Sequence, residues 1–242
     1  MQIDNAFLFA ISVIGVIAFS ISGATASIAK GLDIVGIIVL TVLTSLGGGV
    51  IRDLTLGITP PNLFINPEYY VYFGESVLVA VICFIIAFHN KKNDTMLSKA
   101  ANSKILYVTD AIGLGVFCIS GVDLAIRAGF ADKPLVCIFA GVISGTGGSM
   151  IRDTILNEIP ILFKKYIYII PTVIGTLIYY LLYNVINEVI AFLIGAVVIM
   201  TIRILAIFLK WNLPNVHENP DTSLHISEEK EAKNYEEEGQ QK

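Results

Sequence analysis

The chain has 242 residues, of which 55% are hydrophobic and only 15% are charged, and its mean hydropathy is +0.75. Soluble domains carry more charge than this, so the composition indicates a membrane protein. The formal charge of −4 belongs to the last 33 residues, because the first 209 hold as many acidic as basic side chains. Overall charge therefore gives no support for an acidic or basic partner, and no basic stripe interrupts the apolar segments to bind nucleic acid.

Seven apolar segments are long enough to cross a bilayer as helices. A hydrocarbon core of about 30 Å requires about 20 helical residues, and lipid does not tolerate unpaired backbone groups. The predicted spans cover approximately residues 6–28, 34–57, 69–88, 104–126, 134–157, 166–187 and 189–209. We therefore predict an all-α membrane protein with a transmembrane domain over residues 1–209. Residues 210–242, rich in Glu, Asn, Lys and Gln, are predicted to form a disordered cytoplasmic tail.

The basic residues of the loops predict the orientation of these spans. Cytoplasmic loops are enriched in Lys and Arg, and an odd number of spans places the two termini on opposite sides of the membrane. One side would carry Lys30, Lys91, Lys92, Lys99, Lys104, Lys164, Lys165 and Lys210, and the other only Arg127 and Lys133. We expect a multi-pass protein of the cell membrane with its N-terminus outside and its C-terminus in the cytoplasm.

The chain also contains an internal repeat. Residues 46–60 align with residues 146–160, and both segments carry Gly-Gly, Ile-Arg-Asp, Leu and Pro at matching positions. A second match at an offset of 98 pairs Phe19, Ser22 and Gly23 with Phe117, Ser120 and Gly121. Apolar similarity alone would not preserve an Arg-Asp pair, so we interpret the two segments as copies of one unit.

Each copy contains three spans, over about residues 6–88 and 104–187, and the seventh helix at 189–209 lies outside the repeat. Because three is odd, the second copy enters the membrane from the opposite face. The two halves are then related by a pseudo-twofold axis in the membrane plane, which is typical of transporters and channels.

Glycines cluster inside the second and fifth spans, at Gly47, Gly48, Gly49, Gly145, Gly147 and Gly148. Each glycine costs about 1 kcal/mol relative to alanine in a helix interior, so the clusters favour a bend or a break. Carbonyl groups freed at such a break, if they faced water, could bind cations. The alternative is that the glycines permit close helix packing without any break. We expect the broken helices, with the glycines as hinges beside a pore.

Each glycine cluster precedes an Arg-Asp pair, Arg52–Asp53 and Arg152–Asp153. A charge near the middle of a membrane helix costs about 3 kcal/mol by insertion scales, so these side chains should face protein or water. Adjacent helical residues point about 100° apart, so we expect each arginine to find a partner other than the aspartate beside it.

Acidic residues at matching depth are the expected partners of the two arginines. We predict that Arg52 pairs with Glu75 or Asp123 and that Arg152 pairs with Asp110. These three carboxylates would thus support the charged motif by neutralising its arginines.

Under this pairing, Asp53 and Asp153 would remain available to attract a cation to a water-filled path. The alternative is a structural clasp, in which Arg52 pairs with Asp153 and Arg152 with Asp53. Arg203, about two turns from the end of the seventh span, is expected to extend along its helix to the lipid headgroups.

Two glycine-rich runs followed by Arg-Asp, in three-helix repeats with an added seventh helix, resemble the prokaryotic trimeric intracellular cation (TRIC) channel family. The resemblance covers roughly residues 6–209. It implies a homotrimer in membrane lipid, with one pore in each protomer between the kinked second and fifth helices. The resemblance also implies that potassium and sodium permeate, that the hinges are Gly47, Gly48, Gly49, Gly147 and Gly148, and that the charged motif is Arg52, Asp53, Arg152 and Asp153.

This chain departs from the family pattern in two places. The lysine-bearing signature of the animal proteins, tied to phosphoinositide lipid, is absent from residues 47–53. Ser149 stands where the first repeat has Gly49, so the two halves need not bend equally.

An alternative function is a secondary transporter of a small amino acid such as glycine, since inverted repeats also suit alternating access. A channel needs a continuous wet path with weak sites, whereas a transporter needs a closed substrate pocket. We do not expect an enzyme, because the chain has no HExxH motif, nucleophile elbow or plausible Ser/His dyad. No cofactor or metal site is expected apart from the permeating potassium or sodium ions and bound lipid.

Overall fold

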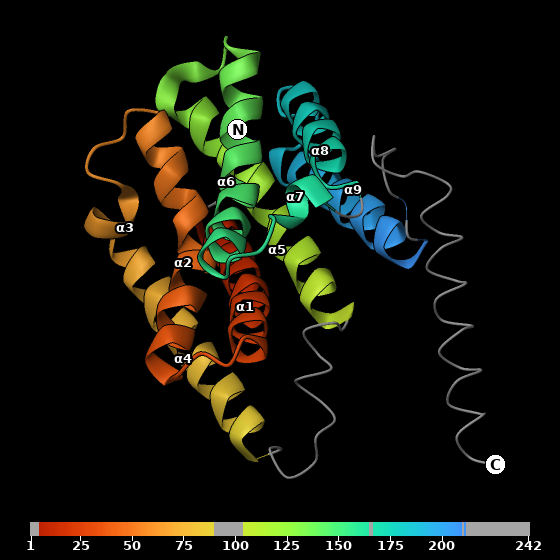
Figure 1. The fold of residues 1–242 in the computed structure, drawn as a ribbon. Helices are drawn as coiled ribbons and strands as arrows, with labels where there is room; N and C mark the ends of the chain where they lie inside the picture. Colours follow the sequence, from red (N-terminus) through yellow and green to blue (C-terminus); the bar gives the residue numbers. More distant parts are fainter. Residues whose placement is uncertain (1–4, 90–103, 165–166, 210, 212–242) are drawn as a thin grey trace, which may run out of the picture. The chain divides into compact units, whose positions relative to one another are not determined.

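The helices of the protein are arranged as shown in Figure 1. The computed structural model describes residues 5–89, 104–164, 167–209 and 211, and all of these belong to one compact unit that ends at Trp211. Within these residues every regular element is helical. The predicted tail lies outside the described residues, apart from Trp211.

All seven predicted spans are present as helices. Their bounds are α1 Asn5–Ala29, α2 Ile34–Thr55, α4 Pro67–His89, α5 Lys104–Ala125, α6 Pro134–Ile155, α8 Ile169–Leu182 and α9 Glu188–Phe208. Six are long and apolar enough to cross a membrane, whereas α8 has only 14 residues and a length of about 21 Å. The short helices α3, Asn62–Ile65, and α7, Ile161–Lys164, occupy matching places after α2 and α6, and a π-helical turn at Ile126–Phe130 extends α5.

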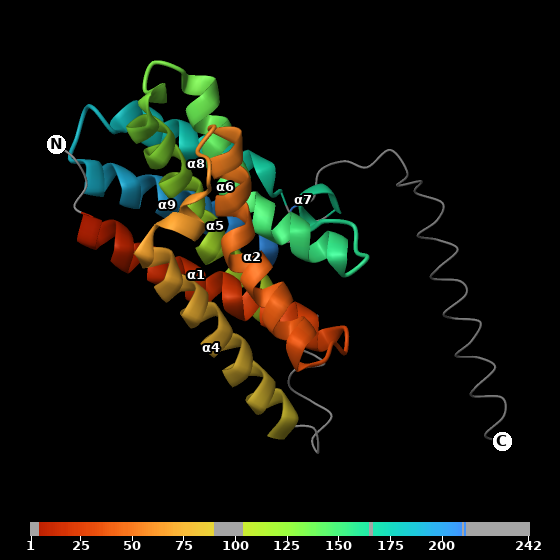
Figure 2. The same cartoon turned by 90° about the vertical axis from the view of Figure 1, so that its left-hand side faces the viewer.

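This order confirms the predicted fold class, two inverted three-helix repeats followed by a seventh helix. Figures 1 and 2 show α2 and α6 crossing with opposite chain directions. An ion pair joins Lys30, which follows α1, to Glu158, which follows α6. The ends of the first and fifth spans therefore lie at the same end of the bundle, as inversion of the second copy requires.

Matching turns end α2 and α6 and return the chain toward the helix. Gly57 and Asn157 adopt left-handed backbone conformations, with φ of 75° and 55°, one residue after the C-caps Leu56 and Leu156. Glycine and asparagine are the residues that tolerate this conformation best. The turn directs the following segment, which contains the short helix α3 or α7, back over the last turn of α2 or α6.

Gly48 and Gly148 lie where α2 and α6 touch. A Cβ atom added to Gly48 would lie 2.3 Å from the carbonyl oxygen of Ser144, and one added to Gly148 would lie 1.9 Å from the carbonyl oxygen of Thr44. Any side chain at these two positions would force the helices apart. Gly145 similarly brings α6 against α5, where an added Cβ would lie 2.4 Å from the sulfur of Cys118.

The glycine clusters predicted a bend or a break in these helices; the break is wrong, and the bend stays a prediction. Both α2 and α6 continue through their glycines as uninterrupted α-helices. Intact helices keep every backbone hydrogen bond in a region where water cannot replace one, and the glycines meet the need for close packing instead. Close packing, the alternative explanation of the glycine clusters, is observed at Gly48, Gly145 and Gly148.

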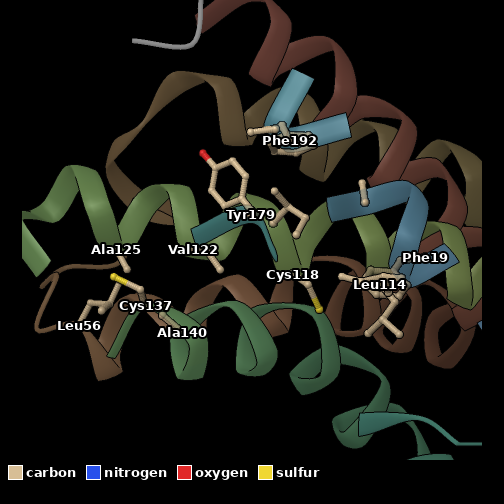
Figure 3. Packing of buried hydrophobic residues seen from close by; sticks show 14 of the residues in the cluster. Phe19, Leu56, Leu114, Cys118, Val122, Ala125, Cys137, Ala140, Tyr179 and Phe192 are labelled. Carbon is tan, nitrogen blue, oxygen red and sulfur yellow. The ribbon is translucent and has the colours of Figure 1, made fainter. Parts of the chain in front are cut away.

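Helix α5 forms the centre of the bundle and α4 its edge. An apolar stretch of 18 residues was compared in each helix. In α5 with its π-helical extension, 61% of these residues are buried, whereas in α4 only 17% are. Figure 3 shows Leu114, Cys118 and Val122 of α5 among side chains of α6, α8 and α9. The exposed apolar side chains of α4 suit contact with lipid, while α5 carries the buried carboxylates of Asp110 and Asp123.

Candidate functional site

The Arg-Asp pair at the end of α2 is deeply buried. Arg52 and Asp53 are 3% and 1% exposed, and the arginine Nε and Nη2 atoms donate to the same carboxylate oxygen of Asp53 at 2.9 and 2.7 Å. The prediction that neighbouring residues cannot pair is therefore wrong. The angle of about 100° separates their Cβ directions, but the long arginine side chain turns back across its own helix.

The two aspartates of the repeated motif also hold the chain that follows each helix. Asp53 Oδ2 accepts hydrogen bonds from the backbone N–H of Asn62 at 2.8 Å and from its side-chain amide at 3.1 Å. Asp153 Oδ2 likewise accepts from the backbone N–H of Ile161 at 2.9 Å. Both carboxylates are consequently engaged, and the prediction that they stay unpaired is wrong for this structure.

Arg52 makes its remaining contacts with hydroxyl groups. Its Nη1 donates to Ser144 Oγ on α6 at 3.3 Å, and its Nη2 donates to the hydroxyl of Tyr69 on α4 at 3.3 Å. We call Arg52, Asp53, Asn62, Tyr69 and Ser144 the first site. It joins α2, α3, α4 and the opposite repeat.

Neither predicted acidic partner of Arg52 pairs with it. Asp123 instead accepts from Arg127 Nε at 2.8 Å, one turn along the chain, and from the hydroxyl of Tyr179 at 2.9 Å. Glu75 lies half-buried on α4, and no described residue donates a hydrogen bond to its carboxylate oxygens. Matching depth was therefore insufficient to identify the partner.

The second repeat builds a similar but more heavily charged centre. Arg152 Nε donates to Asp153 at 2.8 Å, and its Nη1 donates to Asp110 at 3.2 Å and to Ser22 Oγ at 2.7 Å. The predicted pair of Arg152 with Asp110 is confirmed. Tyr168 donates its hydroxyl to the other oxygen of Asp110 at 2.7 Å. These five residues form what we call the second site.

The two repeats interlock through hydroxyl groups. Among the described residues, neither arginine pairs with the aspartate of the opposite repeat, so the alternative clasp is absent. Arg52 instead reaches Ser144 on α6, and Arg152 reaches Ser22 on α1. The α2–α6 crossing thus lies between two buried guanidinium groups related by the repeat.

Arg203 of α9 belongs beside the second site, which the sequence reasoning missed. Its side chain is fully buried, its guanidinium carbon lies 4.0 Å from the ring centre of Tyr168, and its Nη2 is 4.0 Å from Asp110 Oδ2. Its Nη1 donates to the carbonyl of Ile167 at 3.3 Å. The predicted extension to lipid headgroups is wrong. The sequence contains one indication of this contact. Asp110 has the uncharged Ser12 as its counterpart at the repeat offset of 98, so the second repeat needs one more basic partner than the first.

A cavity of about 200 Å³ reaches the first site. Its polar lining includes Ser12, Arg52, Tyr69, Ser120, Asp123 and Arg127. The arginine at the end of α2 therefore borders open space as well as protein. Throughout the described part of the chain, no three His, Cys, Asp or Glu side chains gather to hold a metal ion.

Known proteins share this chain's repeat and fold. A family model described as glycine transporter matches residues 9–88 and 107–184, which correspond to the two repeats. The UPF0126 membrane protein YvgT of Bacillus subtilis is 34% identical over 85% of this chain and 94% of its own length. A UPF0126 membrane protein of Deinococcus radiodurans is 40% identical over 62% of this chain, a match that spans 63% of that relative.

Similarity extends to solved structures. A structure that describes conductance through TRIC cation channels superposes with a TM-score of 0.73 and 34% sequence identity, covering 87% of this chain and 97% of the channel.

Proposed function

Because the chain belongs to the prokaryotic TRIC channel family, we propose that it is a channel for the monovalent cations potassium and sodium. The pore of each protomer would pass between α2 and α6, at the contact formed by their glycines. The observation that carries this proposal is the pair of buried polar centres on either side of the α2–α6 crossing, one of which borders a polar cavity.

Hydroxyl groups near the crossing support a path of weak sites. Ser45 contacts Ser76 at 2.8 Å on the first-repeat side, and Ser149 contacts Tyr168 at 3.1 Å on the second-repeat side. A conducting path needs ligands that bind a cation without retaining it, which neutral oxygen atoms provide. The path would follow these groups from the first site to the second.

Charge pairing controls this path in our proposal. In each site the guanidinium group, which would repel a cation, is neutralised by the neighbouring aspartate. Movement of α2 against α6 at the glycine contact would separate these pairs and turn the carboxylates toward the passing ion. Asp53 and Asp153 would then attract cations only in the open state, rather than permanently.

Loop charges support an orientation with the N-terminus outside and the C-terminus in the cytoplasm. In this orientation α2 runs outward, and Arg52 near its end lies in the outer half of the membrane. The cavity at the first site would then open outward, and the second site would lie on the cytoplasmic side.

We further propose that three copies assemble in the membrane, each with its own pore. An apolar groove of about 350 Å³ lies along the exposed side of the α2–α6 crossing, between Ile51, Ile143, Met150 and Ile155. A second copy can cover such a groove, and the remaining apolar surface, including that of α4, would contact lipid. Light scattering of the purified protein should give the mass of a trimer after correction for detergent, and a monomer mass would contradict this assembly.

Planar-bilayer recording tests the channel proposal against the glycine transporter that the family model's description suggests. The purified protein in potassium chloride should give unitary current steps that persist when potassium is replaced by sodium and vanish with a large organic cation. Saturable uptake of labelled glycine into proteoliposomes, with no unitary current, would replace the channel by a transporter.

A further inference from the structure

The environment of Arg203 resembles a binding site for a small cation. A carboxylate oxygen of Asp110 lies 4.0 Å from its Nη2, the carbonyl of Ile167 accepts from its Nη1 at 3.3 Å, and the ring face of Tyr168 lies 4.0 Å from its central carbon. Carboxylates, backbone carbonyls and aromatic faces all attract cations. Helix α5 and the segment that leads into α8 therefore supply three kinds of cation ligand to one fully buried guanidinium group.

Comparison of the two repeats shows what this arginine balances. Asp110 on α5 corresponds to Ser12 on α1 at the repeat offset of 98, so the second site has one more carboxylate than the first. Arg152 pairs with both Asp153 and Asp110, so these three side chains together carry one net negative charge. Arg203 restores neutrality from α9, the one long helix outside the repeat. Asp110 and Arg203 are thus an acidic and a basic residue that the first repeat lacks, and their charges balance each other.

We propose that the guanidinium group of Arg203 is a tethered cation that occupies a monovalent-cation site formed by Asp110, the Ile167 carbonyl and the Tyr168 ring. An unbalanced carboxylate at this depth is costly, so the site requires a resident positive charge. While Arg203 fills it, a mobile ion cannot enter. When Arg203 withdraws, potassium or sodium takes its place. The inference rests on the proposed function only in placing this site on the conduction path.

The test replaces Arg203 by methionine, which keeps a flexible apolar stem and leaves room for an ion. The full-length protein would be melted in detergent at 3 and 300 mM potassium chloride, with N-methylglucamine chloride keeping the ionic strength constant. We expect the Tm of R203M to rise by about 2 to 4 °C with potassium, as for a ligand that binds only the folded state. The Tm of the wild type should not change between the two solutions.

Two matched variants identify the charge as the cause. Arg203→Lys keeps a tethered cation and should melt without dependence on potassium. The double variant R203M/D110N lacks both the arginine and the carboxylate, so it should fold and also show no dependence. A rise confined to R203M would assign the bound potassium to the charge of Asp110.

Several results would overturn the proposal. One is an R203M variant that folds but melts at the same temperature in both solutions. Another is an R203M variant that does not fold even in 300 mM potassium chloride while R203K folds, because a free cation would then be unable to substitute for the arginine. A potassium response of equal size in the double variant would also contradict it, since the ion would be binding elsewhere.

This measurement is independent of conduction. A potassium-dependent Tm in R203M together with silent bilayers would preserve the cation site and reject the channel. Unitary currents in the wild type with no effect of potassium on the Tm of R203M would preserve the channel and reject the cation site. If the wild type gives unitary currents and the Tm of R203M depends on potassium, R203M should carry a larger unitary potassium current or open more often than the wild type. An R203M channel with unchanged current and opening would show that the cation site lies outside the conduction path.

Discussion

Asp153 shows how one side chain serves both the fold and the proposed path. One of its oxygens accepts from Arg152 at 2.8 Å, and the other accepts from the backbone N–H of Ile161 at 2.9 Å, at the start of α7. The carboxylate therefore neutralises a buried charge and fixes the segment that covers it. Its removal should affect stability and permeation together.

Replacement of Asp153 by asparagine should destabilise the protein by about 3 kcal/mol, because it leaves a buried guanidinium group without one of its two carboxylate partners. The same change should alter potassium conductance or the permeability ratio of potassium to sodium, measured in planar bilayers. Asp53→Asn is the matched change in the first repeat. Unchanged permeation in both variants despite a lower Tm would reduce the Arg-Asp motif to a structural element.

At the residue scale, the sequence predicted burial better than it predicted partners. The pair of Arg152 with Asp110 followed from their depth in the membrane and is confirmed. Arg52 was assigned to distant acids, because helix geometry describes where a side chain starts and not how far an arginine can turn back. Arg203 was assigned to the lipid surface, since the rotation of its helix toward α5 depends on packing and not on spacing.

At the element scale, the central contact is between α2 and α6. Gly48 and Gly148 bring the two backbones so close that an added Cβ would overlap a carbonyl oxygen of the partner helix. Gly49, one residue along, has only the Nη2 atom of Arg52 near its Cβ position, at 3.7 Å. The neighbouring glycines thus have different structural roles, and the difference can be tested.

Gly48→Ala should lower the free energy of unfolding by about 1 to 3 kcal/mol, because the added methyl group would push α2 away from α6. Gly49→Ala is the matched control and should leave stability unchanged or raise it by up to about 1 kcal/mol through helix propensity. Both values would come from unfolding in a mixed-micelle denaturant series. Equal effects of the two substitutions would show that close packing at Gly48 does not hold the crossing together.

The helices themselves were predictable because membrane thickness requires apolar runs of a set length. The main differences concern the glycine clusters and α8. The clusters do not break their helices, and α8 begins at Ile169 and ends at Leu182, inside the predicted span of 166–187. Whether a glycine hinges a helix or admits a neighbour depends on what lies opposite, which one segment of sequence does not contain.

At the scale of the whole molecule, the repeat was the decisive pattern. Two matching Arg-Asp segments in units of three spans require inversion, and the ion pair between Lys30 and Glu158 fits that topology. The asymmetry between the halves was harder to predict, because Asp110 and Arg203 are 93 residues apart and meet only in the folded bundle.

Cysteine labelling of intact cells should establish the orientation of the bundle. Asp132→Cys lies in the loop before α6, and Lys30→Cys lies in the loop after α1. A membrane-impermeant maleimide should label the first variant in intact cells and the second only after lysis, each compared with the native cysteines of the wild type. Labelling in the opposite pattern would reverse the assignment of the two faces.

The most direct test of the central claim asks whether cations pass through the cavity at the first site. Ser12 lines this cavity, and Ser12→Cys would place a thiol there by exchanging a single side-chain atom. In planar bilayers, a thiol-reactive trimethylammonium reagent added on the N-terminal side should reduce the unitary potassium current of this variant and leave the wild type unaffected. Full unitary current after complete modification would show that the path does not run between α2 and α6 as proposed.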